Sequence, residues 1–245
     1  MKRIAIVTGA SSGIGEATAR RFVAEGFGVV GNARNAEKLG ILEKELGSAF
    51  CGIAGDACEE EVLDRLFSSA IERFGRSPDI VVANAGRGLG GSVKDADLSK
   101  FEEILRLNVT GTLALLQKAA RRMAPDYPKE ASDIVIIGSV VGRHISPFSA
   151  VYGATKHAVH SLAEGLRREV GARGIRVSLI EPGIVISGFQ EGAGYGEDQV
   201  RNFEERFGPL LHGEDVANAI HFVVSQPPHV HVSDILVRPT RQDYP

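Results

Sequence analysis

The sequence predicts an α/β protein: a single doubly wound Rossmann-type domain, with about seven parallel strands in one sheet and helices on both faces. Short β-branched runs alternate with longer helical patterns, and several of these runs are continuously apolar, as expected of strands covered on both faces. Repeated strand–helix units give right-handed crossovers and a parallel sheet. Because no linker, low-complexity tract or internal repeat interrupts the chain, residues 1–245 are expected to form one domain.

Seven runs are candidate strands: residues 4–7 (IAIV), 28–31 (GVVG), 49–53 (AFCGI), 79–83 (DIVVA), 133–138 (DIVIIG), 175–180 (IRVSLI) and 234–237 (DILV). The clearest helix between them carries an apolar stripe from Val62 to Phe74. Two more are expected, one from near Leu98 past Leu116 and one from about Val151. The longest stretch without a clear pattern is glycine-rich and covers about residues 183–212. A long irregular segment in a compact domain is usually functional, so we expect a substrate loop there.

Composition excludes several classes of function. The chain is 43% hydrophobic and 24% charged, and its net charge of -3 gives no electrostatic reason to expect a nucleic-acid or membrane-surface partner. Cys51 and Cys58 lack metal-site spacing and are expected to be reduced thiols. The apolar run after the basic start is too short for a signal peptide, and no run approaches a membrane span. We therefore expect a cytoplasmic protein without a bound metal.

A glycine cluster follows the first candidate strand. Gly9, Gly13 and Gly15 stand between the end of the strand and the start of a helix, in the spacing G-x-x-x-G-x-G. Glycines let the backbone turn sharply and approach a ligand, and the helix N-terminus offers free N–H groups and a positive dipole to a pyrophosphate. This arrangement predicts a dinucleotide-binding cradle rather than a simple glycine-rich turn.

At this point the chain resembles the classical short-chain dehydrogenase/reductase family over essentially its whole length. The resemblance is carried by TGASSGIG (8–15), NAG (84–86), Asn108 in LNVTG, Ser139 after the fifth strand, Tyr152-x-x-x-Lys156 and EPGIVIS (181–187), in the order of the family. Two positions depart from its pattern. Ala83 replaces an asparagine before NAG, which leaves the packing of that turn open, and Ser187 replaces a threonine but keeps a hydroxyl.

The resemblance implies a catalytic set of Asn108, Ser139, Tyr152 and Lys156. Ketone reduction needs a proton donor, and the pKa of a tyrosine, about 10, is too high for efficient transfer in both directions. A nearby ammonium lowers the pKa of a phenol, and Lys156 lies one helical turn from Tyr152. By resemblance, Lys156 also bonds the nicotinamide ribose, Ser139 holds the substrate oxygen, and Asn108 anchors a water in a proton relay.

The second strand decides which cofactor is expected. No carboxylate occurs between Glu25 and Glu37, although NAD-binding versions of this architecture place one after this strand to hold the ribose 2′-hydroxyl. Ala33 stands at that place, and Arg34 follows with a guanidinium that can pair with a 2′-phosphate. NADP(H) is therefore expected rather than NAD(H). The expected cofactor-binding residues are Gly9, Ser11, Ser12, Gly13, Ile14, Gly15, Arg34, Asn35, Asp56, Ala57, Asn84, Ala85, Gly86, Tyr152, Lys156, Pro182, Gly183, Val185 and Ser187.

The expected function is an NADP(H)-dependent oxidoreductase that interconverts a small alcohol or hydroxy acid and its carbonyl form. Alternatives are a non-catalytic dinucleotide-sensing protein on the same fold and a structural oligomer subunit. Ser139 to His144 and the loop after Pro182 should form the substrate wall. There Arg143 and Arg87 could meet a carboxylate, although we favour a structural or solvent-facing interpretation of both.

Two further expectations concern the outer surface of the helices. His157 and His160 are interpreted as surface or interface histidines. By resemblance, the helices from about Leu98 and Val151 lie at the interface of a homodimer or homotetramer. Their apolar residues on more than one face include Leu105, Leu113, Leu115, Leu116, Val159 and Leu162.

Overall fold

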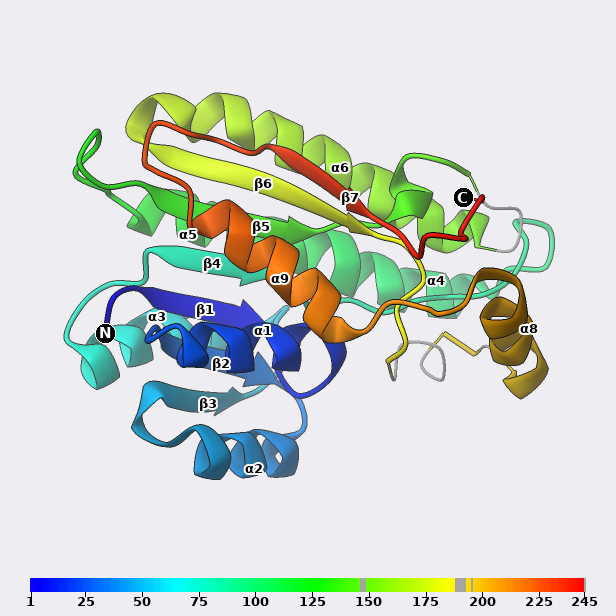
Figure 1. Cartoon of the computed structure of the whole chain (residues 1–245), viewed down its shortest axis with the longest axis horizontal. Helices are drawn as coiled ribbons and strands as arrows, with labels where there is room; N and C mark the ends of the chain where they lie inside the picture. Colours follow the sequence, from blue (N-terminus) through cyan, green and yellow to red (C-terminus); the bar gives the residue numbers. More distant parts are fainter. Residues whose placement is uncertain (146–148, 188–192, 195, 245) are drawn as a thin grey trace.

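The computed structural model describes residues 1–145, 149–187, 193–194 and 196–244. Within these residues seven parallel strands form one sheet in the order β3-β2-β1-β4-β5-β6-β7 (Figure 1). All seven candidate strands are thereby confirmed. Their bounds are β1 Ile4–Thr8, β2 Gly28–Ala33, β3 Phe50–Ala54, β4 Ile80–Ala83, β5 Ser132–Ile137, β6 Ile175–Pro182 and β7 Asp234–Val237.

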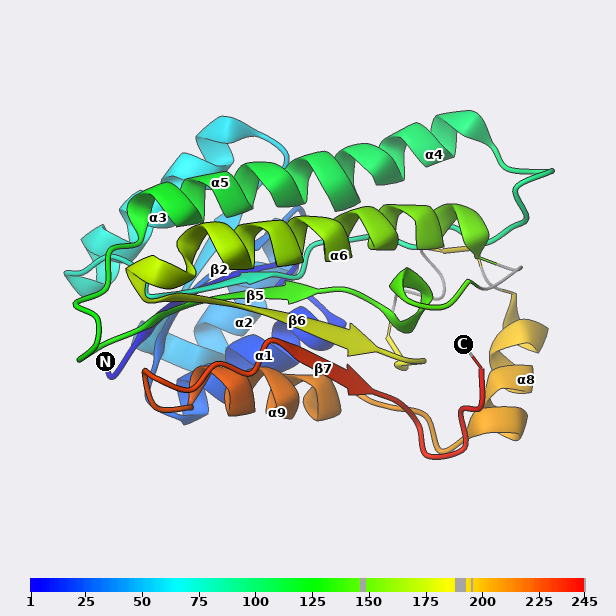
Figure 2. The same ribbon diagram turned by 90° about the horizontal axis from the view of Figure 1, so that it is seen from above.

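Helices cover both faces of the sheet. In Figure 2, α4, α5 and α6 lie along one face, and α1 and α9 lie along the other. The bounds are α1 Gly13–Ala24, α2 Ala36–Leu46, α3 Glu60–Phe74, α4 Leu98–Leu105, α5 Thr112–Arg122, α6 Ala150–Val170, α8 Glu197–Phe207 and α9 Gly213–Val224. A π-helical turn, Arg106–Gly111, joins α4 to α5, so the helix expected from Leu98 past Leu116 is continuous but distorted in its middle.

Two apolar clusters hold these layers together. On one face, side chains of α3, α5 and α6 such as Leu66, Leu115 and Val159 pack against the sheet. On the other, side chains of α1, α2 and α9 such as Phe22 and Ile220 do the same. A parallel sheet buried on both faces needs strands that are apolar throughout, and every residue of β1, β4 and β5 is buried.

Two expectations change with the structure. Part of the segment 183–212 is not irregular, because α8 occupies residues 197–207. The apolar side chains expected at an oligomer interface also fall into two groups, one in the core and one on the surface. Leu115, Leu116 and Val159 belong to the core and Leu162 packs against it, whereas Leu105 and Leu113 are exposed, which leaves a smaller apolar surface than expected. The reason is that α5 and α6 lie flat on the sheet and need these residues to cover it.

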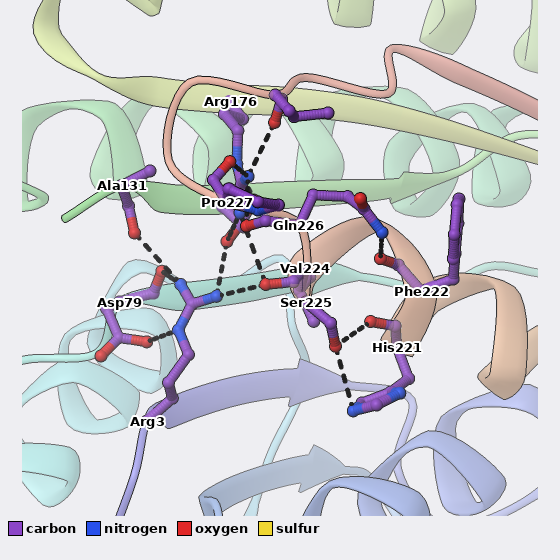
Figure 3. A network of polar contacts seen from close by, with 12 residues as sticks. Arg3, Asp79, Ala131, Arg176, His221, Phe222, Val224, Ser225, Gln226 and Pro227 are labelled. Carbon is purple, nitrogen blue, oxygen red and sulfur yellow. Dashed lines mark hydrogen bonds and ion pairs between the residues drawn. The ribbon is translucent and has the colours of Figure 1, made fainter. Parts of the chain in front are cut away.

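The amino-terminal edge of the sheet is fixed by ion pairs (Figure 3). Arg3 donates to Asp79 at 2.8 Å and to the carbonyl of Val224 at 2.8 Å, and it lies 2.7 Å from Asp133. Arg176 makes two hydrogen bonds with Asp133, of 2.7 and 2.9 Å, and donates to three carbonyls after α9. Each buried charge here faces an opposite charge, and the network ties the strand starts to the connection between α9 and β7.

Candidate active site

A cavity of about 900 Å³ opens at the carboxyl ends of the strands, the edge opposite the ion pairs. The chain leaves β1 toward β2 on one side and reaches β4 on the other, which is the switch point where open α/β sheets bind ligands. Most of the predicted site residues line this cavity. Gly15, Asn35 and Asn108 are not part of the lining, which is formed by Gly9, Ser11–Ile14, Arg34, Asp56, Ala57, Asn84–Gly86, Ser139, Tyr152, Lys156, Pro182, Gly183, Val185, Ser187 and further residues.

The glycines after β1 are required by the local backbone. Gly9 and Gly13 have φ angles of +69° and +54°, a region that other residues rarely adopt. A Cβ atom on Gly15 would lie 2.1 Å from the carbonyl oxygen of Gly9, so only glycine lets α1 begin this close to the turn. Gly15 therefore shapes the cradle from behind. The result is a tight turn whose backbone lines the cavity at a helix N-terminus, which fits a pyrophosphate.

The turn after β4 is fastened to the end of β1. The Thr8 hydroxyl accepts the backbone N–H groups of Asn84 and Ala85 at 3.1 and 3.0 Å, and Asn84 Nδ2 donates to the Thr8 carbonyl at 2.8 Å. Ala83, the departure from the family pattern, is the buried last residue of β4 and pairs with Ile136. The turn is thus held by Thr8 and Asn84, which resolves the question of its packing.

The far end of the cavity holds Arg34, Asp56 and Ala57. Arg34 is exposed directly after β2. Asn35 takes a different place, since its side chain accepts the N–H of Lys38 at 2.9 Å and caps α2. Asp56 accepts from Arg106 at 2.8 Å, and hydrogen bonds from that guanidinium and from Cys58 outweigh desolvation and lower the pKa of the carboxyl group. The surroundings of Arg34 suit a phosphate because its neighbour on β2 is Ala33 rather than an acid.

Three predicted catalytic side chains meet at the other end. Ser139 follows β5 and accepts the N–H of Val141 at 3.3 Å, which begins a short 3-10 helix. Tyr152 lies in the first turn of α6, packed with Val140 and Val141. Lys156 follows one turn later, with its Nζ 5.9 Å from the centre of the Tyr152 ring. All three side chains face the cavity.

Lys156 is the most unusual charge of the site. The residue is only 7% exposed, and its Nζ donates to the carbonyl of Ile137 at 2.7 Å. Desolvation by burial lowers the pKa of its ammonium group from 10.5 to about 8. Among the described residues no carboxylate forms an ion pair with it. A buried cation without a counter-ion is costly, which is typical of a functional site.

Asn108 lies in the π-helical turn and is almost fully buried. Its Oδ1 accepts the N–H of Arg87 at 2.9 Å, while its Nδ2 donates to the Arg87 carbonyl at 2.9 Å and to Thr155 Oγ1 at 3.1 Å. A Cβ on Gly86 would lie 3.3 Å from Asn108 Oδ1 and 3.8 Å from Lys156 Nζ. Gly86 therefore leaves open the space that Asn108 and Lys156 share.

The interpretation of His160 as a surface or interface residue is wrong. Its side chain is 15% exposed and packs under the start of the Ser139 loop. Nε2 lies 3.3 Å from the N–H of Ser139, and Nδ1 lies 3.7 Å from Glu181 Oε2. His157, in contrast, is exposed, and its Nδ1 contacts the Gly153 carbonyl at 2.9 Å. Sequence spacing alone did not separate the two, because the pocket for His160 is made by other elements.

The two arginines considered as contacts for a substrate carboxylate take different positions. Arg143 donates two hydrogen bonds to the fully buried Glu181, one of them through Nε at 2.8 Å. Neither Arg143 nor His144 is among the residues that line the cavity. This agrees with a structural interpretation of Arg143. Arg87 does line the cavity, with its side chain half exposed and 3.6 Å from Glu103. Of the two arginines only Arg87 remains a candidate for the substrate wall.

The C-terminal residues that line the cavity were not among the predicted site residues. Gln242 Oε1 accepts the N–H of Ile184 at 3.0 Å, and the Tyr244 hydroxyl donates to the Ile145 carbonyl. Arg241 donates to two carbonyls at the end of α8. The tail thus joins α8, the segment after Pro182 and the Ser139 loop. The tail and α8 add these residues to the lining: Asn202, Phe203, Arg206, Phe207, Gln242 and Tyr244.

The described part of the chain offers neither a metal site nor a membrane-spanning helix. There, no group of three or more His, Cys, Asp or Glu side chains could hold a metal ion. None of the described helices has both the length and the apolar character to cross a bilayer. Cys51 and Cys58 are free thiols, as expected, and burial is the main cause that raises the pKa of Cys58 to about 11.

Known proteins resemble the whole chain. The sequence is 34% identical to serine 3-dehydrogenase of Agrobacterium fabrum, over 98% of this chain and 94% of that one. An uncharacterized oxidoreductase of Staphylococcus epidermidis is 32% identical over 97% of both chains. Two solved structures superpose well. The closed form of serine dehydrogenase complexed with NADP⁺ has a TM-score of 0.88 at 30% identity, covering 98% of this chain and 96% of that one. Serine dehydrogenase from Escherichia coli has a TM-score of 0.79 at 28% identity, covering 98% and 100%.

The profile of one family, described as short chain dehydrogenase, matches residues 3–197. It spans the cradle after β1, the turn after β4, and Ser139, Tyr152 and Lys156 at the carboxyl edge. The predicted fold class and the oxidoreductase assignment are confirmed, and the NADP⁺ in one similar structure agrees with the expected cofactor. The chain belongs to the short-chain dehydrogenase family of oxidoreductases.

Proposed function

We propose that this protein is an NADP(H)-dependent oxidoreductase that interconverts a small hydroxy acid, or a related alcohol, and its carbonyl form. The observation that carries the proposal is the shared cavity: a glycine cradle and Arg34 line one part of it, and Ser139, Tyr152 and Lys156 line another. Such a cavity accommodates a long dinucleotide and a small substrate side by side. The similarity to serine 3-dehydrogenase makes serine and other 3-hydroxy acids the first substrates to test.

The cofactor is held by groups that fit its parts. The turn at Gly9–Gly13 would receive the pyrophosphate, and Arg34 would pair with the 2′-phosphate without competition from an acid on β2. Ser187, in the segment after β6, approaches the cradle, since a Cβ on Gly13 would lie 3.1 Å from its Cβ. Pro182, Gly183 and Val185 would border the nicotinamide. When bound, NADPH supplies the hydride that the carbonyl carbon accepts.

The chain itself supplies the proton. The Ser139 hydroxyl donates a hydrogen bond to the carbonyl oxygen of the substrate and orients it. Tyr152 transfers its phenolic proton to that oxygen as the carbonyl carbon accepts the hydride. The product is the alcohol, and a phenolate remains. The Lys156 ammonium, buried beside the ring, stabilises this phenolate because a nearby cation favours the ionised form. In the oxidising direction the same groups act in reverse.

A route for returning the proton leads past Gly86. Lys156 Nζ uses one donor on the Ile137 carbonyl, which leaves two N–H groups for the cavity. Asn108 Oδ1 accepts one N–H from Arg87 and has a second lone pair, and both groups border the space that Gly86 leaves open. A water there would accept from Lys156 and donate to Asn108. This placement supports the proton relay that the family resemblance implies.

A non-catalytic dinucleotide sensor is the alternative. Such a protein would bind the cofactor without needing a proton donor, and it would gain stability by replacing a buried lysine. Both Tyr152 and Lys156 are present and face the cavity, which favours catalysis. We also propose a soluble cytoplasmic homo-oligomer, dimer or tetramer, with Leu105 and Leu113 in its interface; light scattering showing a stable monomer at micromolar concentration would contradict the assembly.

The test is a turnover panel. Purified protein with NADP⁺ is offered L-serine, D-serine, other 3-hydroxy acids and uncharged alcohols of the same size, and NADPH absorbance is followed. In the reverse direction NADPH is offered with aldehydes and keto acids. We expect turnover of at least one 3-hydroxy acid and its loss in Tyr152→Phe. Cofactor binding without turnover of any compound would favour the sensor.

A further inference from the structure

The clearest feature that the proposed reaction leaves unused is a chain of four polar residues beneath Ser139. It runs from Arg143 through Glu181 and His160 to the backbone of Ser139. Three elements contribute: the loop after β5, the end of β6, and α6 two turns beyond Tyr152. Glu181 directly precedes Pro182, so the chain connects the segment proposed for the nicotinamide to the serine proposed for the substrate.

The first link neutralises a buried charge. Glu181 is fully buried, and Arg143 donates to both of its carboxylate oxygens. A carboxylate in this position without a cation would be strongly unfavourable, and the bidentate pair fixes its plane. Because Arg143 already balances the charge of Glu181, the carboxylate does not require a second cation at His160.

The second link fixes the state of the imidazole. His160 Nε2 lies 3.3 Å from the backbone N–H of Ser139, which can only donate, so Nε2 must be the unprotonated acceptor. The proton is therefore on Nδ1, which faces Glu181 Oε2 at 3.7 Å. Burial lowers the pKa of His160 to about 4, and Lys156, His157 and Arg143 oppose protonation while Glu181 favours it. A neutral ring of this tautomer accepts the N–H of Ser139 and turns its own N–H toward Glu181, 3.7 Å away.

The third observation is that the surrounding backbone leaves room for this ring. Cβ atoms on Gly138 or Gly142 would each lie 2.4 Å from His160 Nε2. Gly138 directly precedes Ser139 and Gly142 ends the short 3-10 helix after it, so the ring is enclosed by the loop that presents the serine. The match of a glycine on each side with one imidazole is difficult to explain if His160 were merely a surface residue.

We propose that His160 is a positioning residue for Ser139, with Arg143 and Glu181 orienting its ring. His160 accepts the Ser139 N–H and thereby holds the start of the 3-10 helix, which sets the direction of the serine hydroxyl toward the substrate oxygen. The proposal rests on the proposed function, because Ser139 is taken as the substrate-orienting hydroxyl. His160 itself is not among the residues that line the cavity.

Two substitutions separate this role from simple packing. His160→Leu removes the acceptor, whereas His160→Gln can place an amide oxygen near the position of Nε2. We expect His160→Leu to lower kcat at least about tenfold while changing the NADPH dissociation constant less than about twofold, since the cradle is untouched. His160→Gln should remain within about threefold of the unaltered kcat. His229→Gln, exposed on the connection after α9, is the matched control and should change neither.

NMR spectroscopy of the histidine rings tests the proposal without a turnover assay. In protein labelled with ¹⁵N-histidine, the resonances that disappear in His160→Gln should report a neutral ring protonated on Nδ1 at pH 7. Stability gives a second arm. Between pH 6.5 and 4 the unfolded histidine gains a proton that the folded one does not, so stability falls as pH falls through this window. His160→Gln should lose less Tm than the unaltered protein between pH 7 and 5, by roughly 4 °C.

Three results would overturn the proposal: an unchanged kcat in His160→Leu, an equal loss in His160→Gln and His160→Leu, or an Nε2-protonated or charged ring at pH 7. Failure of the proposed function has a different signature. The unaltered protein would then turn over no compound of the panel, while the tautomer and the pH dependence of Tm would still decide the role of His160.

Discussion

Replacing Lys156 with methionine should make the protein more stable at pH 7 and inactive. The pKa of the buried ammonium falls from 10.5 to about 8 on folding because its environment lacks water and a counter-ion. Each unit of pKa corresponds to about 1.36 kcal/mol, so keeping this charge buried at pH 7 costs about 3 kcal/mol of folding free energy. Methionine has a similar length and carries no charge.

The gain is smaller than the full cost because one hydrogen bond is lost. The Ile137 carbonyl accepts from Lys156 Nζ at 2.7 Å, and leaving a buried acceptor without a donor costs about 1–3 kcal/mol. We therefore expect Lys156→Met to be more stable by about 0–2 kcal/mol at pH 7. For a chain of this length that is a rise in Tm of up to roughly 8 °C.

The stability difference between Lys156→Met and the unaltered protein should depend on pH. Below pH 8 the lysine is charged in both the folded and unfolded states, and the cost is complete. Between pH 8 and 10.5 the folded protein loses the proton while the unfolded chain keeps it, so the stability of the unaltered protein rises. The advantage of Lys156→Met should therefore shrink as pH rises from 8 toward 10.5.

Thermal and urea unfolding of both proteins at pH 7 and pH 9.5 provide the measurement. Lys118→Met is the control, since Lys118 is also largely buried but pairs with Asp64 at 2.6 Å, and its loss should destabilise the protein. If Lys156→Met were less stable than the unaltered protein at pH 7, or if the difference did not depend on pH, the reasoning about the uncompensated charge would be refuted.

Three further outcomes are expected. Tyr152→Phe should fold and bind NADPH normally, but its kcat should fall about 10²–10⁴-fold because only the proton donor is removed. Normal turnover of this variant would refute the proposed mechanism. Arg34→Ala should weaken NADPH binding about ten- to a hundredfold while sparing NADH, measured by fluorescence titration, because one charged pair contributes about 1.5–3 kcal/mol; equal or better catalytic efficiency of the unaltered protein with NADH would refute the cofactor assignment. Gln242→Ala should lower the unfolding free energy by about 1–3 kcal/mol and raise KM, because the Ile184 N–H loses its buried acceptor; an unchanged Tm and KM would show that the tail does not hold this segment.

The strands and the cradle could be predicted because their signals are local. Short continuous apolar runs such as Ile4–Val7 are typical of strands covered on both faces, and Gly9 and Gly13 stand where the backbone adopts positive φ. The proposed catalytic pair of α6 was equally accessible to prediction, since Tyr152 and Lys156 are four residues apart on one helix.

The parts that could not be predicted depend on distant neighbours. The burial of His160 is decided by Gly138 and Gly142, on a different element, and the place of Gln242 is decided by the docking of the tail on Ile184. The helix α8 was missed because its apolar residues are few and glycines flank it on both sides. For His160 and Gln242 the local sequence was compatible with a surface position, and tertiary packing decided otherwise.

The two edges of the sheet carry buried charges for different reasons. At the amino-terminal edge Arg3 and Arg176 meet Asp79 and Asp133, and their remaining donors reach carbonyls, so every charge is satisfied and the edge is held together. At the carboxyl edge Lys156 meets only a carbonyl and the face of Tyr152 among the described residues. Stability explains the first arrangement and opposes the second. A cation that the fold keeps against its own stability, facing a phenol at the mouth of a dinucleotide cradle, is best explained by the proton transfer proposed for Tyr152.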